Sequence, residues 1–488
     1  MSDRLPLMVP GAKPGPDILE VTAPYDQSPI RTLETAGLDA VDVALGTAAR
    51  LYRDRDSWLE PYERIQILEG AAAIVSGRAE ELALEAAREG GKPLIDSRVE
   101  VARAIDCLKL CVVEMRTAAG EEIPMERNLA SSGRIALTRH EPIGVVVAFS
   151  AFNHPLNLIV HQVGPAVATG CPAIVKPAEA TPLSCYRFVE ILREAGLPPE
   201  WCQALTVADL DVAGALMSDP RVGFFSFIGS AQVGWMLRSR LAPGSRCALE
   251  HGGVAPVIVA ADADLDLALP ALAKGGLYHA GQVCVSVQRV FAHEEVAGAV
   301  ASGLAELAAG MVVGDPTADG TDVGPLIRPA EVDRVGDWVA EAEEGGGQIL
   351  TGGEPVSATC YQPTVLFDPP ADARVSTREV FGPVICVYPY RGLPDAIERA
   401  NALPYAFQAS VFTRDIDTAV RAADRLDAGA VMINDHTAFR VDWMPFGGIR
   451  QSGLGVGGIR YTMRDMQIEK LIVLRSKGLD REPGHRKD

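Results

Sequence analysis

The sequence predicts an α/β protein with a doubly wound parallel sheet, a second α/β region and a small β arm. From residue 143 onward, short β-branched runs such as IGVVVAFS, PAIVKPA and GFFSFIGS alternate with segments of helical length. A second region with this alternation extends from about 254 to 430. Two strand-like segments, 121–142 and 467–476, lie outside both regions. Buried strands that alternate with helices pair in parallel through βαβ crossovers, which predicts a nucleotide-binding sheet.

The elements before this sheet are mainly helical. Residues 1–35 are rich in Pro and Gly and predict an irregular lead-in with one or two short strands. Ala/Leu/Glu-rich segments predict helices at 38–53, 60–88 and 95–116, the second of which ends at the Gly90-Gly91 pair. Alternating residues around a Ser-Ser-Gly turn make 121–142 an expected hairpin.

The remaining elements follow the βα alternation. Helices are expected from Pro155 to Gly170, at 182–196 and from Ala231, and a further helix at 264–280 follows the strand VIVAADADLD. The tail QIEKLIVLRS and the hairpin have no obvious partner strand nearby in the sequence. We therefore expect them to pair with another chain, in a homodimer or homotetramer.

The composition is that of an ordinary globular protein. The 488 residues are 48% hydrophobic and 22% charged, which is enough chain for roughly two to four domains. A net charge of −19 argues against nucleic acid or an anionic membrane as a partner. No apolar run approaches the roughly 20 residues of a membrane-spanning helix, and the N-terminal segment lacks the pattern of a secretory signal.

Nine cysteines are spread from Cys107 to Cys386 without paired metal-ligand spacing. This is typical of a reducing compartment, and it predicts neither a disulfide framework nor a metal site. We expect a cytoplasmic protein whose cysteines mostly pack in the core.

Seven segments in a fixed order carry a resemblance to a known family. They are PIGVVVAFSAFNHPLNL, IVKPAEATPLS, FIGSAQVG, LEHGG, GQVCVSVQR, EVFGPV and MPFGGIRQSGLG. Their order and spacing resemble the NAD(P)-dependent aldehyde dehydrogenase superfamily, over about residues 40–475. The resemblance implies an NAD(P)-binding domain at 1–120 and 141–252, a catalytic domain at 253–433, and an oligomerisation arm with a C-terminal tail at 121–140 and 462–488.

The resemblance also implies the catalytic groups. Cys284 stands at the position of the family's nucleophile, and Glu250 in LEHGG at that of its general base. Asn153 matches the side-chain donor of the oxyanion hole, beside the Cys284 backbone N–H. Taken singly, each residue has a simpler reading, as a core cysteine, an ion-paired carboxylate or a helix cap. A thiolate that adds to an aldehyde carbon needs donors for the oxyanion and a base for the later hydrolysis, which these residue types supply.

The cofactor is expected to be NAD, with NADP left open. Glu179 can accept hydrogen bonds from both ribose hydroxyls and would repel a 2′-phosphate, whereas Lys176 would offset part of that repulsion. The strand-to-helix turn at Gly229-Ser230 can hold a phosphate on helix-terminal N–H groups. The cofactor-binding positions implied by the resemblance are Phe149, Lys176, Glu179, Gly229, Ser230, Glu379 and Phe381.

The sequence departs from the family where the substrate tunnel is expected. Ala-Phe-Asn-His, residues 151–154, replaces the common Pro-Trp-Asn-Phe. Positions i, i+3, i+4 and i+7 of the helix that follows share one face, and three of these four positions carry polar groups. The implied substrate-binding residues are His154, Asn157 and His161 on this face, which also carries Leu158, together with Arg103 and Arg440. Either arginine could instead pair with an acid such as Glu100 or Asp442.

Donors buried in a tunnel are costly without an anion to satisfy them. We therefore expect a small anionic aldehyde, most simply a phosphonate or sulfonate. Family members that act on phosphonoacetaldehyde look similar around AFNHP, although Val283 offers no cation beside the nucleophile. A carboxylic semialdehyde, lactaldehyde or glyceraldehyde 3-phosphate are alternatives, as are a CoA-acylating enzyme and a non-catalytic structural homologue.

Overall fold

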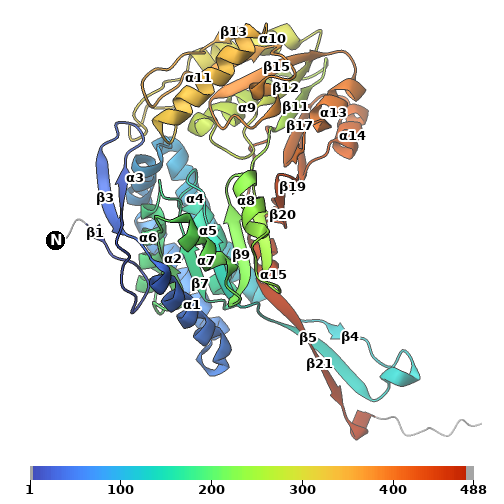
Figure 1. Ribbon diagram of the computed structural model, residues 1–488. Coiled ribbons are helices and arrows are strands. Elements are labelled where there is room, and N and C mark those ends of the chain that lie inside the picture. The colour runs from blue at the N-terminus through green and yellow to red at the C-terminus, as the bar shows by residue number, and fades with distance from the viewer. Residues whose placement is uncertain (1–3, 480–488) are drawn as a thin grey trace, which may run out of the picture.

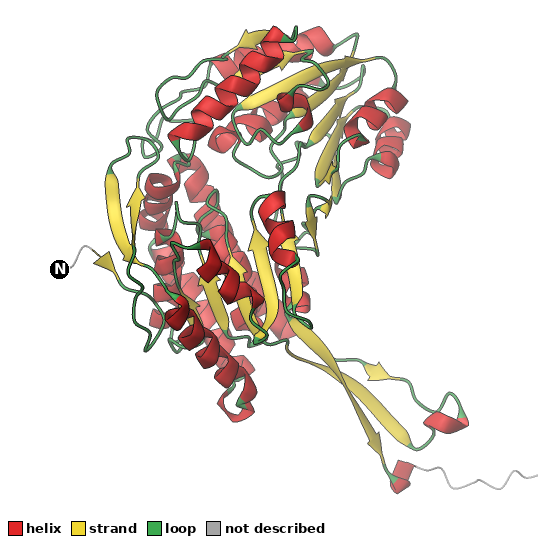
Figure 2. Cartoon of the chain, viewed as in Figure 1, coloured by secondary structure: helices red, strands yellow, loops and turns green. Residues whose placement is uncertain are grey.

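Two α/β domains lie one above the other in the computed structural model, which describes residues 4–479, and a narrow β arm projects from the lower domain (Figure 1). Helices cover both sheets (Figure 2). The predicted fold class is confirmed. Among the described helices, none is both long and apolar enough to span a membrane.

The lower sheet has the strand order β20–β10–β9–β6–β7–β8 and is parallel except for β20. Its strands are β6 (Val145–Phe149), β7 (Ala173–Lys176), β8 (Cys202–Ala204), β9 (Val222–Ile228), β10 (Arg246–Glu250) and β20 (Gly453–Leu454). The helices that alternate with them are α5 (Asn157–Thr169), α6 (Leu183–Glu194), α7 (Leu210–Ser218) and α8 (Ala231–Arg238). The edge strand β20 and its neighbour β10 were not predicted from the sequence.

Burial explains the continuous apolar strand β6. Val146 and Ala148 pack into the core beneath α2 (Pro61–Gly77), α4 (Leu94–Thr117) and α5. Val145, Val147 and Phe149 face the opposite core, which α1 (Leu38–Arg53) and α7 cover. A strand that is buried on both faces has no position for a polar residue, and so the pattern is unbroken rather than alternating.

The N-terminal part adds a small sheet and four helices to the lower domain. It comprises β1 (Arg4–Leu5), β2 (Ile18–Thr22), β3 (Pro29–Glu34), α1 (Leu38–Arg53), η1 (Arg55–Ser57), α2 (Pro61–Gly77), α3 (Ala79–Gly90) and α4 (Leu94–Thr117). The single helix expected at 60–88 is wrong, because the chain breaks into two helices at Arg78. There the backbone leaves the helical region, and the Arg78 carbonyl accepts the Leu82 N–H that opens the second helix.

The upper sheet has the order β13–β14–β15–β12–β11–β17–β18, with only β13 antiparallel. Its strands are β11 (Pro256–Val259), β12 (Arg289–His293), β13 (Gln348–Thr351), β14 (Thr364–Phe367), β15 (Val384–Tyr390), β17 (Gln408–Phe412) and β18 (Ala430–Ile433). Its helices are α9 (Leu265–Leu277), η3 (Tyr278–Gly281), α10 (Ala297–Ala309), α11 (Pro329–Glu344), α12 (Arg374–Thr377), α13 (Leu393–Asn401) and α14 (Ile416–Arg425). The short pair β16 (Tyr405–Ala406) and β19 (Ile449–Arg450) and helix α15 (Ile459–Asp465) lead back to the lower domain.

The arm consists of β4 (Glu122–Ile123), β5 (Arg134–Pro142) and β21 (Gln467–Arg475), with η2 (Leu129–Ser131) and η4 (Lys477–Leu479) at its tip. The expectation that the hairpin and the tail lack partners in their own subunit is wrong. β21 pairs with β5 antiparallel over its whole length, from Gln467 opposite Pro142 to Arg475 opposite Arg134. The local pattern identified both strands, but a partner so distant along the chain leaves no local signal. The outer edge of β21 is open, and residues 480–488 of the expected tail lie outside the described residues.

Candidate active site

A cavity of about 840 Å³ opens between the two domains and gathers most of the predicted site. The predicted residues that line it are Arg103, Asn153, His154, Asn157, Gly229, Ser230, Glu250, Cys284, Glu379, Phe381 and Arg440. Phe149, Lys176, Glu179 and His161 lie outside this lining. Segments far apart in the sequence therefore meet around one space.

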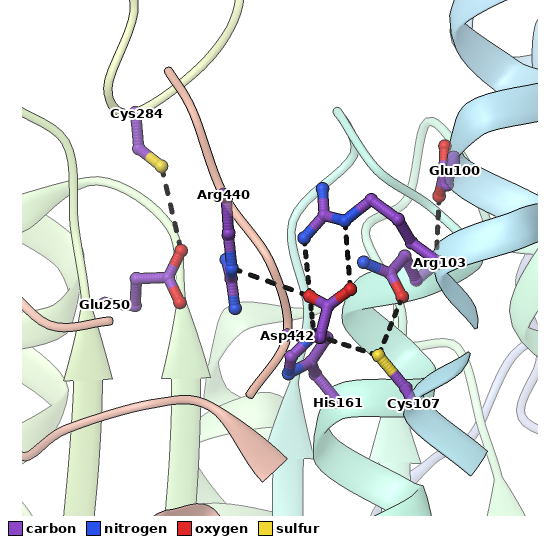
Figure 3. Close-up of polar contacts among 9 residues, drawn as sticks. Glu100, Arg103, Cys107, His161, Glu250, Cys284, Arg440 and Asp442 are labelled. Atoms are coloured by element: carbon purple, nitrogen blue, oxygen red, sulfur yellow. Dashed lines mark hydrogen bonds and ion pairs between the residues drawn. The ribbon is translucent and has the colours of Figure 1, made fainter. Parts of the chain in front are cut away.

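Cys284 and Glu250 face each other across the cavity. Cys284 follows η3, and Glu250 is the last residue of β10. The thiol Sγ lies 3.7 Å from Glu250 Oε1, a long contact in which the thiol donates (Figure 3). The turn before Cys284 has positive φ at three successive residues, and a Cβ on the last of them, Gly281, would lie 2.1 Å from the Gly382 carbonyl oxygen. Only glycine fits there, so the loop is tightly fixed.

Burial favours the protonated form of both groups. Burial, and secondarily the neighbouring Glu250 carboxyl, raises the pKa of the Cys284 thiol well above its usual value, whereas Arg440 lowers it. Burial also raises the pKa of Glu250, against the attraction of Arg440 and the thiol hydrogen bond. Once it is ionised, a carboxylate of raised pKa in contact with the thiol can take the thiol proton during attack.

Asn153 supplies an amide beside the thiol. Its Nδ2 donates to the carbonyl of Gln282, two residues before Cys284, at 2.9 Å. An amide nitrogen carries two donor hydrogens, so one is left for another acceptor. The Cys284 backbone N–H has no acceptor among the hydrogen bonds of residues 4–479. Two donors next to the nucleophile are what a tetrahedral oxyanion requires.

The start of α5 is fixed by Glu100 rather than by Asn153. Glu100 Oε1 accepts the backbone N–H groups of Leu156 and Asn157 at 2.9 Å each, and its other oxygen pairs with the fully buried Lys92. The helix begins at Asn157, later than expected, so His154 lies in the preceding turn, where its carbonyl accepts the Leu158 N–H. His154 still lines the cavity, and burial lowers its pKa well below the usual value.

A closed polar network, which we call the recess, lies on the far side of Arg440 from Cys284 and contains Arg103, His161, Arg440 and Asp442 (Figure 3). Arg103 donates to both carboxylate oxygens of Asp442, at 2.6 and 3.0 Å, and His161 Nε2 lies 2.8 Å from Oδ1. Burial opposes ionisation of Asp442, but the hydrogen bonds of His161 and Arg103 outweigh it and hold its pKa well below the usual range. Burial lowers the pKa of His161 to about 4, so its ring is neutral at pH 7. The pairing of Arg103 with Asp442, weighed above as an alternative, is the one observed, whereas Glu100 pairs with Lys92.

Arg440 is the less satisfied cation of the recess. Its side chain is only 10% exposed, and its guanidinium lies over the Phe446 ring, 3.6 Å from the centroid. Its Nε is 3.7 Å from Asp442 Oδ1 and has no hydrogen-bond partner among the described residues. A buried guanidinium with an unused donor in a cavity wall is suited to bind an anion.

The residues implied for the cofactor form a surface that fits a dinucleotide. Gly229 and Ser230 lie between β9 and the first turn of α8, whose N–H groups can hold a phosphate. Glu379 packs so closely on the backbone that a Cβ on Gly252 would lie 1.6 Å from its Oε1, and burial raises its pKa to about 8. Phe381 contacts Phe152 edge to face.

The second group of cofactor positions lies where β7 ends. Lys176 Nζ is 3.7 Å from Glu179 Oε1 and lies over the Phe149 ring, 5.6 Å from its centroid. Burial lowers the pKa of Lys176, whereas Glu179 is more than half exposed. Ala178, between them, lines the cavity, so an adenosine ribose in the cavity would lie near both charges.

Several residues in and around the site were not predicted from the sequence. They include Lys92, Cys107, Tyr278, the ion-paired Arg328, Glu331 and Arg334, and Phe446. Cys107, His161 and Asp442 place ligand-type atoms within 4.8 Å of one another, as a metal site would. Two guanidiniums already neutralise Asp442 there and would repel a cation.

Comparison with known proteins agrees with this geometry. The model of the aldehyde dehydrogenase family matches residues 12–472. The 3-sulfolactaldehyde dehydrogenase of Priestia aryabhattai is 38% identical over 456 residues, which cover 93% of this chain and 94% of that protein. The structure of aldehyde dehydrogenase 21 from Physcomitrella patens, in complex with the reaction product succinate, has a TM-score of 0.92 at 34% identity and covers 97% of this chain and 98% of its own.

A second solved structure bears on the cofactor. The glyceraldehyde-3-phosphate dehydrogenase GapN of Methanocaldococcus jannaschii, complexed with NADP, has a TM-score of 0.90 at 34% identity and covers 95% of this chain and 100% of its own. The chain belongs to the aldehyde dehydrogenase family. It is an NAD(P)-dependent oxidoreductase that acts on the aldehyde group, as the sequence predicted.

Proposed function

We propose that Cys284 is the nucleophile that attacks the aldehyde carbon. As the sulfur–carbon bond forms, the thiol proton passes to the Glu250 carboxylate, 3.7 Å away in the resting site. The carbonyl oxygen becomes an oxyanion, which Asn153 Nδ2 and the Cys284 N–H stabilise. The attacking groups start close together, so little reorganisation precedes this step.

Oxidation then leaves a thioester on Cys284, and Glu250 directs its hydrolysis. Glu379 and Phe381 would hold the nicotinamide end of the cofactor in the cavity, where it would supply the acceptor for the hydride that departs from the former aldehyde carbon. After the proton taken from the thiol has passed to solvent, Glu250 removes a proton from water, whose oxygen attacks the thioester carbon. The carbon–sulfur bond breaks, the carboxylic acid leaves as its carboxylate and a proton, and the departing thiolate takes the proton held by Glu250. A buried carboxyl with a raised pKa is a stronger base than an exposed one once it is ionised. A CoA-acylating enzyme would not need such a base, which favours hydrolysis.

The substrate we propose is a small aldehyde with an anionic group at its far end. The observation that carries this proposal is Arg440, whose buried guanidinium has an unused donor in the wall that also holds Cys284. The relatives named above point the same way, because sulfolactaldehyde, glyceraldehyde 3-phosphate and the precursor of succinate all carry an anion away from the aldehyde. A sulfo- or phosphono-aldehyde stands first. A carboxylic semialdehyde is second, in view of the succinate complex.

This proposal is tested by kcat/KM for anionic and neutral aldehydes of equal length, measured by NAD(P)H formation. The unaltered enzyme should prefer the anionic members, and Arg440→Met should lose on the order of tenfold or more on them, since a hydrogen bond to a charged group is lost. Arg103→Ala should also lose activity on them, because Asp442 is then free to recruit Arg440. Arg391→Met, at a side chain that is 86% exposed, is the matched control. A preference for neutral aldehydes, or no loss in Arg440→Met, would contradict the proposal.

We also propose that the arm joins subunits into a homodimer or homotetramer. The open edge of β21 carries exposed apolar residues, including Leu471 and Leu474, and an exposed apolar strand edge favours pairing with another chain. Light scattering at micromolar concentration should give a mass of two or four chains, and a monomer would contradict this assembly.

A further inference from the structure

The recess holds a fixed number of charges, and Asp442 sets that number. Arg103 and Arg440 each contribute a positive charge, and the buried Asp442 contributes a negative one. His161 is neutral at pH 7, because burial lowers its pKa to about 4. Asp442 therefore cancels one of the two arginines and leaves the recess with a single net positive charge.

The neighbouring groups leave this charge unchanged. Lys92 and Glu100 form a buried ion pair that cancels itself. Burial raises the pKa of the Cys107 thiol, which stays protonated. Val283 places no charge beside the nucleophile, and Glu250 lies on the opposite side of Arg440, where it contacts Cys284 (Figure 3).

We infer that Asp442 is a specificity-determining residue that matches the recess to a monoanionic substrate group, a sulfonate, and selects against a dianionic phosphate. This inference rests on the proposed function, since it assumes that the anion of the substrate binds at Arg440. Asp442 need not touch the substrate, because it acts through the charge of the recess and through the position of Arg103.

Charge matching explains the selection. A sulfonate is singly charged and neutralises the recess, whereas a phosphate monoester carries about −1.5 to −2 at pH 7 and leaves negative charge uncompensated in a buried place. An unpaired buried charge is costly, and so is the unpaired Arg440 that a neutral aldehyde would leave. A substituent with a single negative charge is therefore favoured at the far end of the substrate.

The experiment uses three substrates that share a 2-hydroxyaldehyde and differ in charge: lactaldehyde, 3-sulfolactaldehyde and glyceraldehyde 3-phosphate. In the unaltered enzyme, kcat/KM should be highest for the sulfonate. Asp442→Asn raises the net charge of the recess to two and should shift the phosphate-to-sulfonate ratio of kcat/KM toward phosphate by on the order of tenfold. A neutral His161 can donate or accept, so the asparagine can keep a hydrogen-bonded partner.

A double variant separates the charge from the fold. Arg103→Gln alone lowers the net charge to zero and should remove the advantage of both anions over lactaldehyde. The double variant Arg103→Gln/Asp442→Asn returns the net charge to one through Arg440 alone. It should recover the preference for sulfonate, which a variant with a merely damaged site would not do. Thermal melting and NAD(P)H binding identify variants that have lost the fold.

The outcomes distinguish the two proposals. If the unaltered enzyme prefers lactaldehyde to both anions, the anion site itself is contradicted. If it prefers anions but uses the phosphate as well as the sulfonate, if Asp442→Asn gives the same ratio as the parent, or if the double variant fails to recover the preference for sulfonate, only the inference about Asp442 is overturned.

Discussion

On one side of Arg440, Cys284 and Glu250 share a single contact of 3.7 Å, whereas on the other side Asp442 accepts three hydrogen bonds of 2.6 to 3.0 Å from Arg103 and His161 (Figure 3). Burial acts on both sides. It favours the protonated forms of Cys284 and Glu250, but the network around Asp442 overcomes it and keeps that carboxylate ionised. The reacting side therefore keeps a proton to move, and the binding side keeps its charge fixed.

The same contrast extends to the backbone. The loop of Cys284 is held by glycines at positions where a side chain cannot fit, and its N–H is left without an acceptor within residues 4–479. The start of α5 is instead saturated by Glu100, which accepts two N–H groups. A donor that must bind a transient oxyanion has to be free in the resting enzyme, whereas a donor that only positions a helix can be bonded permanently.

Removing the base should give the largest effect on the reacting side. We expect Glu250→Gln to lower steady-state kcat by about 10²- to 10⁴-fold, because hydrolysis then lacks its general base. A first burst of NAD(P)H is retained but slower, because the thiol must then lose its proton to solvent. Since burial raises the pKa of Glu250, kcat of the parent should rise with pH as this carboxyl ionises, and the variant should lose that rise. Stopped-flow and steady-state absorbance at several pH values measure both quantities. Unchanged turnover in Glu250→Gln would assign the base to another group.

Removing the free amide tests the oxyanion donors. Asn153→Ala should slow the burst itself by on the order of 10²-fold or more, about 3 kcal/mol of barrier, with little change in the melting temperature. Asn401→Ala serves as the control, because it removes an amide outside the cavity that donates to the Arg425 carbonyl and accepts the Asp427 N–H. A normal burst rate in Asn153→Ala would leave the oxyanion to other donors.

On the binding side, the ionisation of His161 should change the free energy of unfolding rather than the reaction rate. The pKa of His161 is about 4 in the folded protein against about 6.5 unfolded, so the unfolded chain binds more protons between these values. The stability that the neutral ring provides is present above pH 6.5 and is lost as the pH falls toward 4. We expect the advantage of the parent over His161→Gln in unfolding free energy to shrink by roughly 1–2 kcal/mol between pH 7 and 5. Urea unfolding at the two pH values measures this change, with the exposed His140→Gln as control. An advantage that stays constant would contradict a neutral His161.

The sequence predicted the parts of this site that depend on short segments. The strands β6, β7 and β9 and the helices after them follow from local patterns, and the roles of Cys284 and Glu250 were implied by the resemblance of the short segments GQVCVSVQR and LEHGG to a known family. The groups that meet across long distances were harder to predict. Arg103 bonds Asp442 across 339 positions, and β21 pairs with β5 from the opposite end of the chain. Neither residue type nor periodicity encodes such a choice of partner, because it is decided by how whole elements pack.

One measurement tests both sides of Arg440 at once. The Glu250→Gln variant is mixed with NAD(P) and equal concentrations of lactaldehyde, 3-sulfolactaldehyde and glyceraldehyde 3-phosphate. The reaction is quenched within the burst, and the masses of the enzyme's peptides are measured by mass spectrometry. The account predicts an acyl group on Cys284, with the sulfonate-bearing acyl group in excess over the other two. An acyl group on another cysteine, or a dominant lactyl group on Cys284, would contradict it.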